Sequence, residues 1–308
     1  MALKAARRSA IAPFIVMDVL QAATARDRAA STAAGRSVHL EIGQPGTGAP
    51  RPVLDAAARA LYADKLGYTE TFGLPLLRES IRTHYRTAYG ADVATDRIVV
   101  TTGSSAGFIL AFLAAFDVGD RVALAAPGYP AYRNILSALG IEVVSLPVDS
   151  RVRFQPTVEL LEAAGPLDGL IVASPANPTG TMLSAAQLAE LADWCHRRGV
   201  RFVSDEIYHG IVFGGAASTA LASSPSTIVI NSFSKYYAMT GWRLGWMVMP
   251  PDLIRPVEVL AQNLFISPPT LPQHAAIAAF ACTDELEAKV AHYRANRDLL
   301  IAELPKSG

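Results

Sequence analysis

The sequence predicts an α/β protein built on a seven-stranded, mostly parallel sheet. Helical patterns alternate with short apolar runs rich in β-branched residues, which is typical of a parallel sheet between helical layers. The expected strands are residues 97–101, 121–125, 141–146, 169–173, 201–204, 227–231 and 245–249.

The expected strands read as continuous apolar runs, which indicates burial on both faces. Between them, residues 185–199 (AAQLAELADWCHRRG) place apolar side chains at helical spacing, and Gly199 is positioned to end that helix. A second helix is expected at AGFILAFLAAF, after the TTGSSAG motif. We expect an N-terminal arm and small-domain segment over residues 1–49 and a large domain over 50–283. Residues 284–308 then begin a C-terminal small domain.

Composition and charge favour a small-molecule site. The 27 basic and 27 acidic residues cancel, so charge gives no reason to expect nucleic acid or an anionic membrane as partner. No apolar run approaches the length that spans a bilayer. The two cysteines, Cys195 and Cys282, form neither a metal-binding spacing nor a disulfide framework. We therefore expect a cytoplasmic protein without a metal site.

Polar or glycine-rich residues follow five of the seven expected strands. Ligands of parallel α/β sheets bind beyond the carboxyl ends of the strands, so these residues are the candidate site. The motifs are TTGSSAG, APGYP, SPANPTG, DEIYHG and NSFSKYY.

Lys235 lies just beyond the sixth expected strand, in NSFSK. Partial burial disfavours an ammonium and lowers its pKa, as an amine that forms a Schiff base requires. Ser232 and Ser234 flank the lysine with hydroxyl groups, and Arg243 follows with a guanidinium suited to a phosphate. The alternative is a surface lysine in a polar turn.

Asp205 ends the fifth expected strand, where a buried carboxylate needs a partner. A protonated pyridine nitrogen is one such partner, and the carboxylate would keep that ring positive and electron-withdrawing. The alternative is a cap for a following helix. Tyr208, three residues later, can place a phenol hydroxyl beside the same ring.

Three loops add candidate contacts. Asn177 lies in a tight turn fixed by Pro178 and Gly180. Ser104 and Ser105 precede a helix, where backbone N–H groups and hydroxyls bind anions, unless one serine merely caps that helix. Tyr129 can stack on a flat ring, although an aromatic residue at a loop start also suits core packing.

Together these motifs resemble the fold-type I, class I/II family of pyridoxal 5′-phosphate (PLP) dependent aminotransferases. The similarity runs through nearly the whole chain, and SFSKYYAMTGWRLGW is its most specific part. It also includes the segments LEIGQPG, GYTETFGLPLLRESI, TTGSSAG, PGYP, SPANPTG and SDEIYHG.

The resemblance implies a role for each matching residue. Lys235 would hold PLP as a Schiff base and then carry the proton between substrate and cofactor. Asp205 would pair with the pyridine nitrogen, Tyr208 and Asn177 would hydrogen-bond the phenolic oxygen, and Tyr129 would stack on the ring. Gly43 would lie by the substrate carboxylate. The residues implied to hold the phosphate are Ser104, Ser105, Ser232, Ser234 and Arg243, with Tyr68 reaching the phosphate of the neighbouring subunit of a homodimer.

The chain departs from the family pattern in two ways. The family's substrate-carboxylate arginine lies well beyond position 308, so the chain resembles a C-terminally truncated enzyme. Ser105 and Gln262 stand where acid-specific subgroups carry a lysine and an arginine, which favours neutral or aromatic amino acids.

Three other functions stay open. A β- or γ-eliminating lyase or synthase would use the same cofactor residues. A non-catalytic effector-binding module would carry an extra helix-turn-helix domain, and the first 40 residues predict only a short arm. An inactive fragment is the third alternative.

Overall fold

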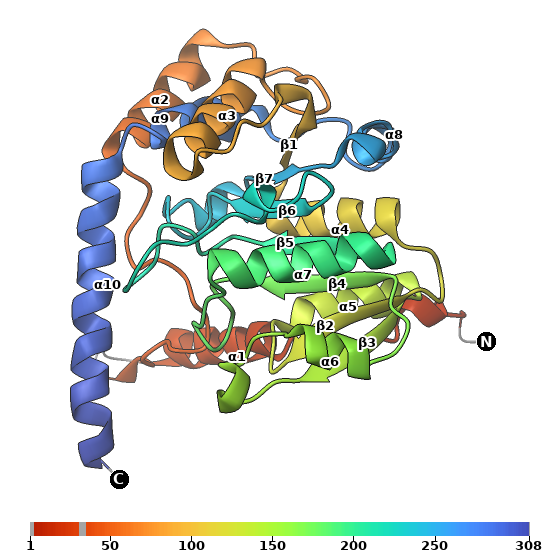
Figure 1. The fold of residues 1–308 in the computed structure, drawn as a ribbon. Coiled ribbons are helices and arrows are strands. Elements are labelled where there is room, and N and C mark those ends of the chain that lie inside the picture. The colour runs from red at the N-terminus through yellow and green to blue at the C-terminus, as the bar shows by residue number, and fades with distance from the viewer. Residues whose placement is uncertain (1–2, 31–34, 308) are drawn as a thin grey trace.

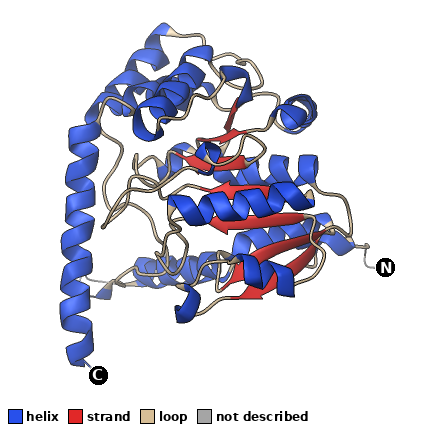
Figure 2. Ribbon diagram, in the orientation of Figure 1, coloured by secondary structure: helices blue, strands red, loops and turns tan. Residues whose placement is uncertain are grey.

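The computed structural model describes residues 3–30 and 35–307, and a seven-stranded sheet forms its centre (Figures 1 and 2). Each strand bound agrees with the predicted one to within a residue. The strands are β1 (Ile98–Thr101), β2 (Arg121–Ala126), β3 (Glu142–Pro147), β4 (Gly169–Ala173), β5 (Arg201–Asp205), β6 (Ile228–Ser232) and β7 (Gly245–Val248).

The strands are arranged in the order β1-β7-β6-β5-β4-β2-β3. β7 is antiparallel to both of its neighbours, and all other neighbouring pairs are parallel. The prediction of a mostly parallel sheet is therefore confirmed. The carboxyl ends of β1, β2, β4, β5 and β6 lie at one edge of this sheet.

Helices alternate with strands from β1 to β5, whereas only short 3-10 turns separate β5, β6 and β7. The helices are α1 (Ile15–Ala29), α2 (Arg51–Ala63), α3 (Pro75–Tyr89), α4 (Gly103–Ala115), α5 (Pro130–Leu139), α6 (Val158–Ala163), α7 (Ala185–Arg198), α8 (Ile254–Leu264), α9 (Thr270–Ala279) and α10 (Thr283–Glu303). Among the described helices, none is long and apolar enough to cross a membrane.

The ends of two helices, α7 and α4, can be compared with the ends that the sequence predicts. α7 begins at a capping box formed by Ser184 and Gln187, and it ends at Gly199 in the left-handed conformation (φ +69°), as predicted. α4 begins earlier than expected, so Ser104 and Ser105 lie in its first turn rather than before it. The residue at the N-cap is Thr102, and the prediction that a serine could cap this helix is wrong.

Alternate side chains of each strand enter two separate cores. In β1, Ile98 and Val100 join the core under α2, α3, α7 and α9, while Val99 joins the core under α4, α5 and α8. Figure 1 shows α6 and α7 covering one face of the sheet and α4 and α5 covering the other. Because both faces are covered, successive positions of a central strand are apolar, as in β4 (GLIVA), which explains the continuous apolar runs.

The terminal segments lie outside the sheet. The residues before α1 contact α5, where Asn134 Nδ2 donates to the Ala12 carbonyl at 3.2 Å. α10 is a long helix along one side of the molecule (Figure 1). α10 is joined to the N-terminal segment where Lys289 Nζ donates to the Gly48 carbonyl at 2.9 Å. The division at residues 49 and 283 into an arm, a large domain and part of a small domain stays a prediction.

The carboxylate of Glu206 is enclosed within the protein, next to the buried Asp205. Glu206 follows β5 and is 1% exposed, and burial raises its pKa to about 8. Its Oε1 accepts from the Ala220 N–H at 2.8 Å and from the Thr219 hydroxyl at 3.0 Å, whereas Oε2 is buried without a hydrogen-bond partner. A proton on Oε2 at neutral pH accounts for this one-sided arrangement.

We expect Glu206→Gln to make the free energy of unfolding less dependent on pH. The folded chain keeps the Glu206 proton up to about pH 8, while an unfolded glutamate releases it near its ordinary value of 4.5. Stability contributed by the neutral form is therefore lost as the pH rises between these values. Urea unfolding from pH 5 to 8.5 should show a shallower decline for the variant, and Glu258→Gln on the surface of α8 serves as control. Equal slopes for wild type and Glu206→Gln would contradict the prediction.

Candidate active site

The candidate site lies at the sheet edge where the predicted motifs meet. Lys235 follows β6, Asp205 ends β5, and Asn177 lies in the loop after β4. Tyr208 lies between them, with Asn177 Nδ2 donating to its hydroxyl at 3.4 Å and Lys235 Nζ 5.9 Å from its ring centroid. The predicted convergence of these strand ends is confirmed as a structural arrangement.

Lys235 is held as a half-buried amine. Its Nζ donates to the Gly43 carbonyl at 2.5 Å, which ties the lysine to the N-terminal segment. Burial lowers the pKa of Lys235, and the positive charge of Arg243 lowers it further. The surroundings therefore favour the neutral, nucleophilic form of the amine.

Asp205 is buried, and its described partners are neutral donors. The Tyr132 hydroxyl donates to its Oδ2, and the Ile207 N–H donates to its Oδ1 at 3.1 Å. Burial raises the pKa of Asp205 to about 6, and these two hydrogen bonds oppose the rise. A cationic group brought to this carboxylate would stabilise its ionised form. The Asp205 carboxylate thus fits a protonated ring nitrogen. A turn, and not a helix, follows β5, so the alternative that Asp205 caps a helix is wrong.

Tyr208 and Asn177 form a pair of hydrogen-bond donors. Burial and the charge of Asp205 raise the pKa of Tyr208 to about 12, so its hydroxyl stays protonated at neutral pH. Asn177 Nδ2 has a second N–H besides the one it gives to Tyr208. Both groups can donate to one anionic oxygen placed beside them.

Tyr129 lies beside the same carboxylate. Its half-buried ring packs edge-on against Tyr132, with centroids 5.2 Å apart, and edge-on against Phe14 at 5.7 Å. Burial raises the pKa of Tyr129, and the charge of Asp205 adds to the rise. The ring is thus fixed near Asp205, as stacking on a ligand held by that carboxylate would require.

Arg243 and the first turn of α4 together form an anion cradle. A Cβ atom built on Gly103 would lie 2.6 Å from Arg243 Nη2, so only glycine lets the guanidinium approach here. Arg243 has a left-handed backbone (φ +53°) and donates from Nη1 to the Thr240 carbonyl at 3.0 Å. The guanidinium therefore lies beside the N–H groups of a helix start, an arrangement that binds phosphate.

The two serines beside Lys235 are buried. The Ser232 hydroxyl lies 2.9 Å from the Ser234 hydroxyl and 3.1 Å from the Leu244 carbonyl, and it accepts from the Ser234 N–H at 3.1 Å. Ser232 thus shapes the loop that carries Lys235. Tyr68, by contrast, is 83% exposed on the described chain.

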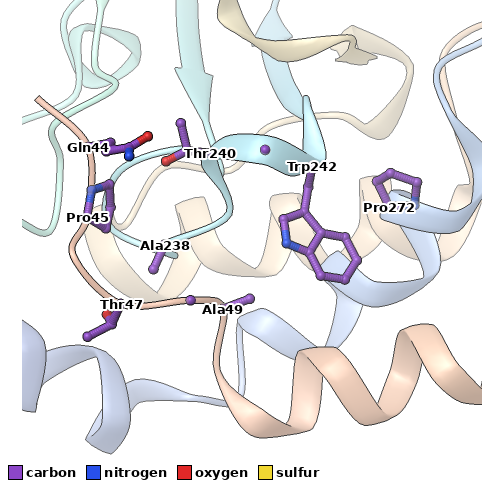
Figure 3. Close-up of a pocket in the computed structure, with 10 residues that line it drawn as sticks. Gln44, Pro45, Thr47, Ala49, Ala238, Thr240, Trp242 and Pro272 are labelled. Atoms are coloured by element: carbon purple, nitrogen blue, oxygen red, sulfur yellow. The ribbon is translucent and has the colours of Figure 1, made fainter. Parts of the chain in front are cut away.

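Two clefts adjoin the site. One, of about 670 Å³, has Asn177 and Tyr208 in its wall. The other, of about 640 Å³, lies between residues 44–49 and the segment that follows Lys235 (Figure 3). Figure 3 shows Trp242 and Pro272 on one side of this second cleft and Gln44 and Pro45 on the other. Its ten lining residues carry no charged side chain.

Tyr132 is the site residue that the sequence analysis did not name. It lies three residues after Tyr129, about one turn of α5 further on, and its buried hydroxyl reaches Asp205. Helical spacing from Tyr129 was the available signal. The acceptor, seventy-three positions away in the chain, could not be identified without the fold.

Comparison with known proteins agrees with this geometry. Residues 36–308 match the family described as aminotransferase class I and II. The chain is 51% identical to the valine–pyruvate aminotransferase of Mycobacterium tuberculosis, over 99% of this chain and 79% of that protein. It is 37% identical to the (5-formylfuran-3-yl)methyl phosphate transaminase of Methanocaldococcus jannaschii, over 89% of this chain and 71% of that protein.

A solved structure matches equally well. The crystal structure of an aminotransferase from Mycobacterium tuberculosis superposes with a TM-score of 0.95 at 51% identity, covering 100% of this chain and 80% of that one. The sheet, the strand ends and the sequence similarity over most of the chain lead to one conclusion: the chain belongs to the class I and II aminotransferases.

Proposed function

We propose that the chain transfers an amino group between an amino acid and a 2-oxo acid, with PLP bound covalently to Lys235. The observation that carries the proposal is the half-buried amine of Lys235, with its pKa lowered by burial, beside Tyr208 and at the same sheet edge as Asp205. Family membership supports the reaction type, because the relatives named above are aminotransferases.

Each part of the cofactor has a fitting group in the chain. Asp205 would hold the pyridine nitrogen in its protonated form, and Tyr132 would orient that carboxylate. Asn177 and Tyr208 would donate to the phenolic oxygen. Tyr129 would stack on the ring. The residues proposed to hold the phosphate are Ser104, Ser105, Ser232, Ser234 and Arg243.

The bound cofactor supplies an electron sink for the pair of electrons left at the substrate carbon. The chain's own contribution is proton movement and orientation. Lys235, whose pKa is lowered by burial and by the charge of Arg243, would accept and return a proton once a substrate amine has displaced it. Gly43, whose carbonyl contacts Lys235, is proposed to lie by the substrate carboxylate.

The favoured substrates are neutral amino acids. The cleft between residues 44–49 and the segment after Lys235 is lined by uncharged residues, so a side chain placed there meets no charged partner. The cleft with Asn177 and Tyr208 in its wall also carries Arg153 and Arg297. Ser105 and Gln262 provide no cation. The valine–pyruvate activity named for the 51% identical relative supports the same substrate class. A β- or γ-eliminating reaction on the same cofactor is the second candidate, because the cofactor residues alone do not decide which bond breaks.

We further propose that the chain acts as a homodimer in the cytoplasm. Tyr68 is 83% exposed on the described chain, so its hydroxyl would be accessible to the phosphate of a second copy. Both cysteines are buried free thiols, which suits a reducing compartment.

Lys235→Ala should abolish the cofactor's Schiff-base absorbance and transamination together, because no other amine takes this position. Absorbance spectra before and after borohydride, followed by single-turnover assays, measure both. Lys289→Ala is the matched control, since Lys289 also donates to a carbonyl of the N-terminal segment. A Lys235→Ala protein that kept the reducible absorbance and full turnover would overturn the proposal.

A donor panel tests the substrate class. With pyruvate and 2-oxoglutarate as acceptors, neutral aliphatic or aromatic donors should give kcat/KM about tenfold above aspartate, a difference of about 1.4 kcal/mol, if the substrate side chain enters the uncharged cleft beside residues 44–49. A preference for aspartate would instead point to the cleft that carries Arg153 and Arg297. Ammonia release without consumption of the 2-oxo acid would instead establish elimination.

Tyr68→Phe tests the role of the second subunit. We expect sedimentation to show a dimer for both wild type and variant, and the variant to bind PLP about fivefold more weakly through the loss of one hydrogen bond. A monomeric wild type, or a dimeric variant with unchanged PLP affinity, would refute this assignment.

A further inference from the structure

A buried histidine, His209, directly follows Tyr208 in the sequence. His209 is 5% exposed, and both ring nitrogens are engaged. Its Nε2 lies 3.0 Å from the Ser174 carbonyl, and its Nδ1 lies 2.9 Å from the Tyr89 hydroxyl. A carbonyl oxygen can only accept, so Nε2 carries the hydrogen and Nδ1 accepts from Tyr89.

The ring is neutral, and so is its acidic neighbour. Burial lowers the pKa of His209 to about 4, while Glu206, whose Oε2 lies 3.6 Å from Nδ1, has its pKa raised to about 8. The other titratable group that affects the ring is His84, packed beside Tyr89. The single N–H of the neutral ring therefore lies on Nε2, because the Ser174 carbonyl at 3.0 Å can only accept.

This hydrogen bond joins the two segments that carry the donor pair. Ser174 begins the loop that holds Asn177, and its N–H donates to the Asp205 carbonyl at 3.2 Å. His209 belongs to the turn that holds Tyr208, and its N–H donates to the Glu206 carbonyl at 3.0 Å. The Nε2–Ser174 bond therefore crosses from one segment to the other, next to the 3.4 Å contact between Asn177 and Tyr208.

We propose that His209 is a positioning residue that holds Asn177 and Tyr208 in register, so that both donate to the phenolic oxygen of bound PLP. The inference rests on the proposed function, since it concerns the cofactor's orientation in that site. His209 does not touch the reacting atoms. It acts through one buried side-chain hydrogen bond, which adds to the backbone bond from Ser174 to Asp205 and restrains the distance between the loop and the turn.

The expected consequence has a definite sign. Two donors to the phenolic oxygen stabilise its anion and reduce its attraction for the proton on the Schiff-base nitrogen, which lowers the pKa of that nitrogen. Loss of the register weakens both donations. The pKa of the Schiff base should then rise, and PLP should bind less tightly.

Three variants of the holoenzyme test the proposal. His209→Phe keeps the ring but removes the donor, and His209→Gln restores an N–H near the Nε2 position. His84→Phe is the matched control, a like-for-like change in the same aromatic cluster of a histidine whose ring makes no described hydrogen bond. The measurements are the pH titration of the Schiff-base absorbance, the Kd of PLP by fluorescence, and thermal unfolding of each cofactor-free protein.

We expect His209→Phe to raise the pKa of the Schiff base by about one pH unit and the Kd of PLP about fivefold. His209→Gln should return both values toward wild type, and His84→Phe should leave both unchanged. Should His209→Phe fail to fold, Tyr89→Phe removes the hydroxyl that donates to His209 Nδ1, and it should shift the same two values by a smaller amount.

Unchanged titration curves in His209→Phe, or equal shifts in His209→Phe and His84→Phe, would overturn the proposal. So would a loss of thermal stability in His209→Phe with no spectroscopic change. Failure of the proposed function is distinguishable, because wild type itself would then show no borohydride-sensitive absorbance.

Discussion

The parallel register of β4, β5 and β6 is the constraint on which the site depends. Asp205 pairs across the sheet with Ala173 on one side and Ile230 on the other. Because the three strands are in register and run in the same direction, their following residues leave the sheet at the same edge. Asn177, Tyr208 and Lys235 are each within five residues of a registered position. A slip of one residue in β5 would move Asp205 to the opposite face.

Burial at this edge sets the chemistry of the side chains. The same low-dielectric surroundings raise the pKa of Asp205, raise that of Tyr208 and lower that of Lys235. Each shift favours the neutral form, so the enclosed groups are poised to receive a ligand that brings its own charges. A cationic ring nitrogen would pair with Asp205, and an anionic phosphate would pair with Arg243. The neutrality of the whole chain, with equal numbers of acidic and basic residues, is therefore compatible with strong local polarity.

A second layer of buried side chains lies behind the site and holds its groups in place. Tyr132 holds Asp205 from α5, and His209 links the turn after β5 to the loop after β4. The aromatic cluster of Tyr85, Tyr89 and Trp246 encloses this layer on the side of α3. Buried hydrogen bonds are costly to leave unmade, so each fixes the geometry of the groups in front of it.

The sequence by itself determined the strand bounds, the mostly parallel sheet and the residues at its edge, because continuous apolar runs and the polar motifs that follow them are local signals. Only the tertiary structure decided the strand order, the antiparallel direction of β7 and the start of α4 at Gly103. It also decided that Asp205 pairs with Tyr132, 73 positions away along the chain, and that His209 pairs with Ser174, 35 positions away. Such contacts depend on how helices and loops pack over the sheet, and no local pattern of apolar and polar residues indicates which distant residues will meet.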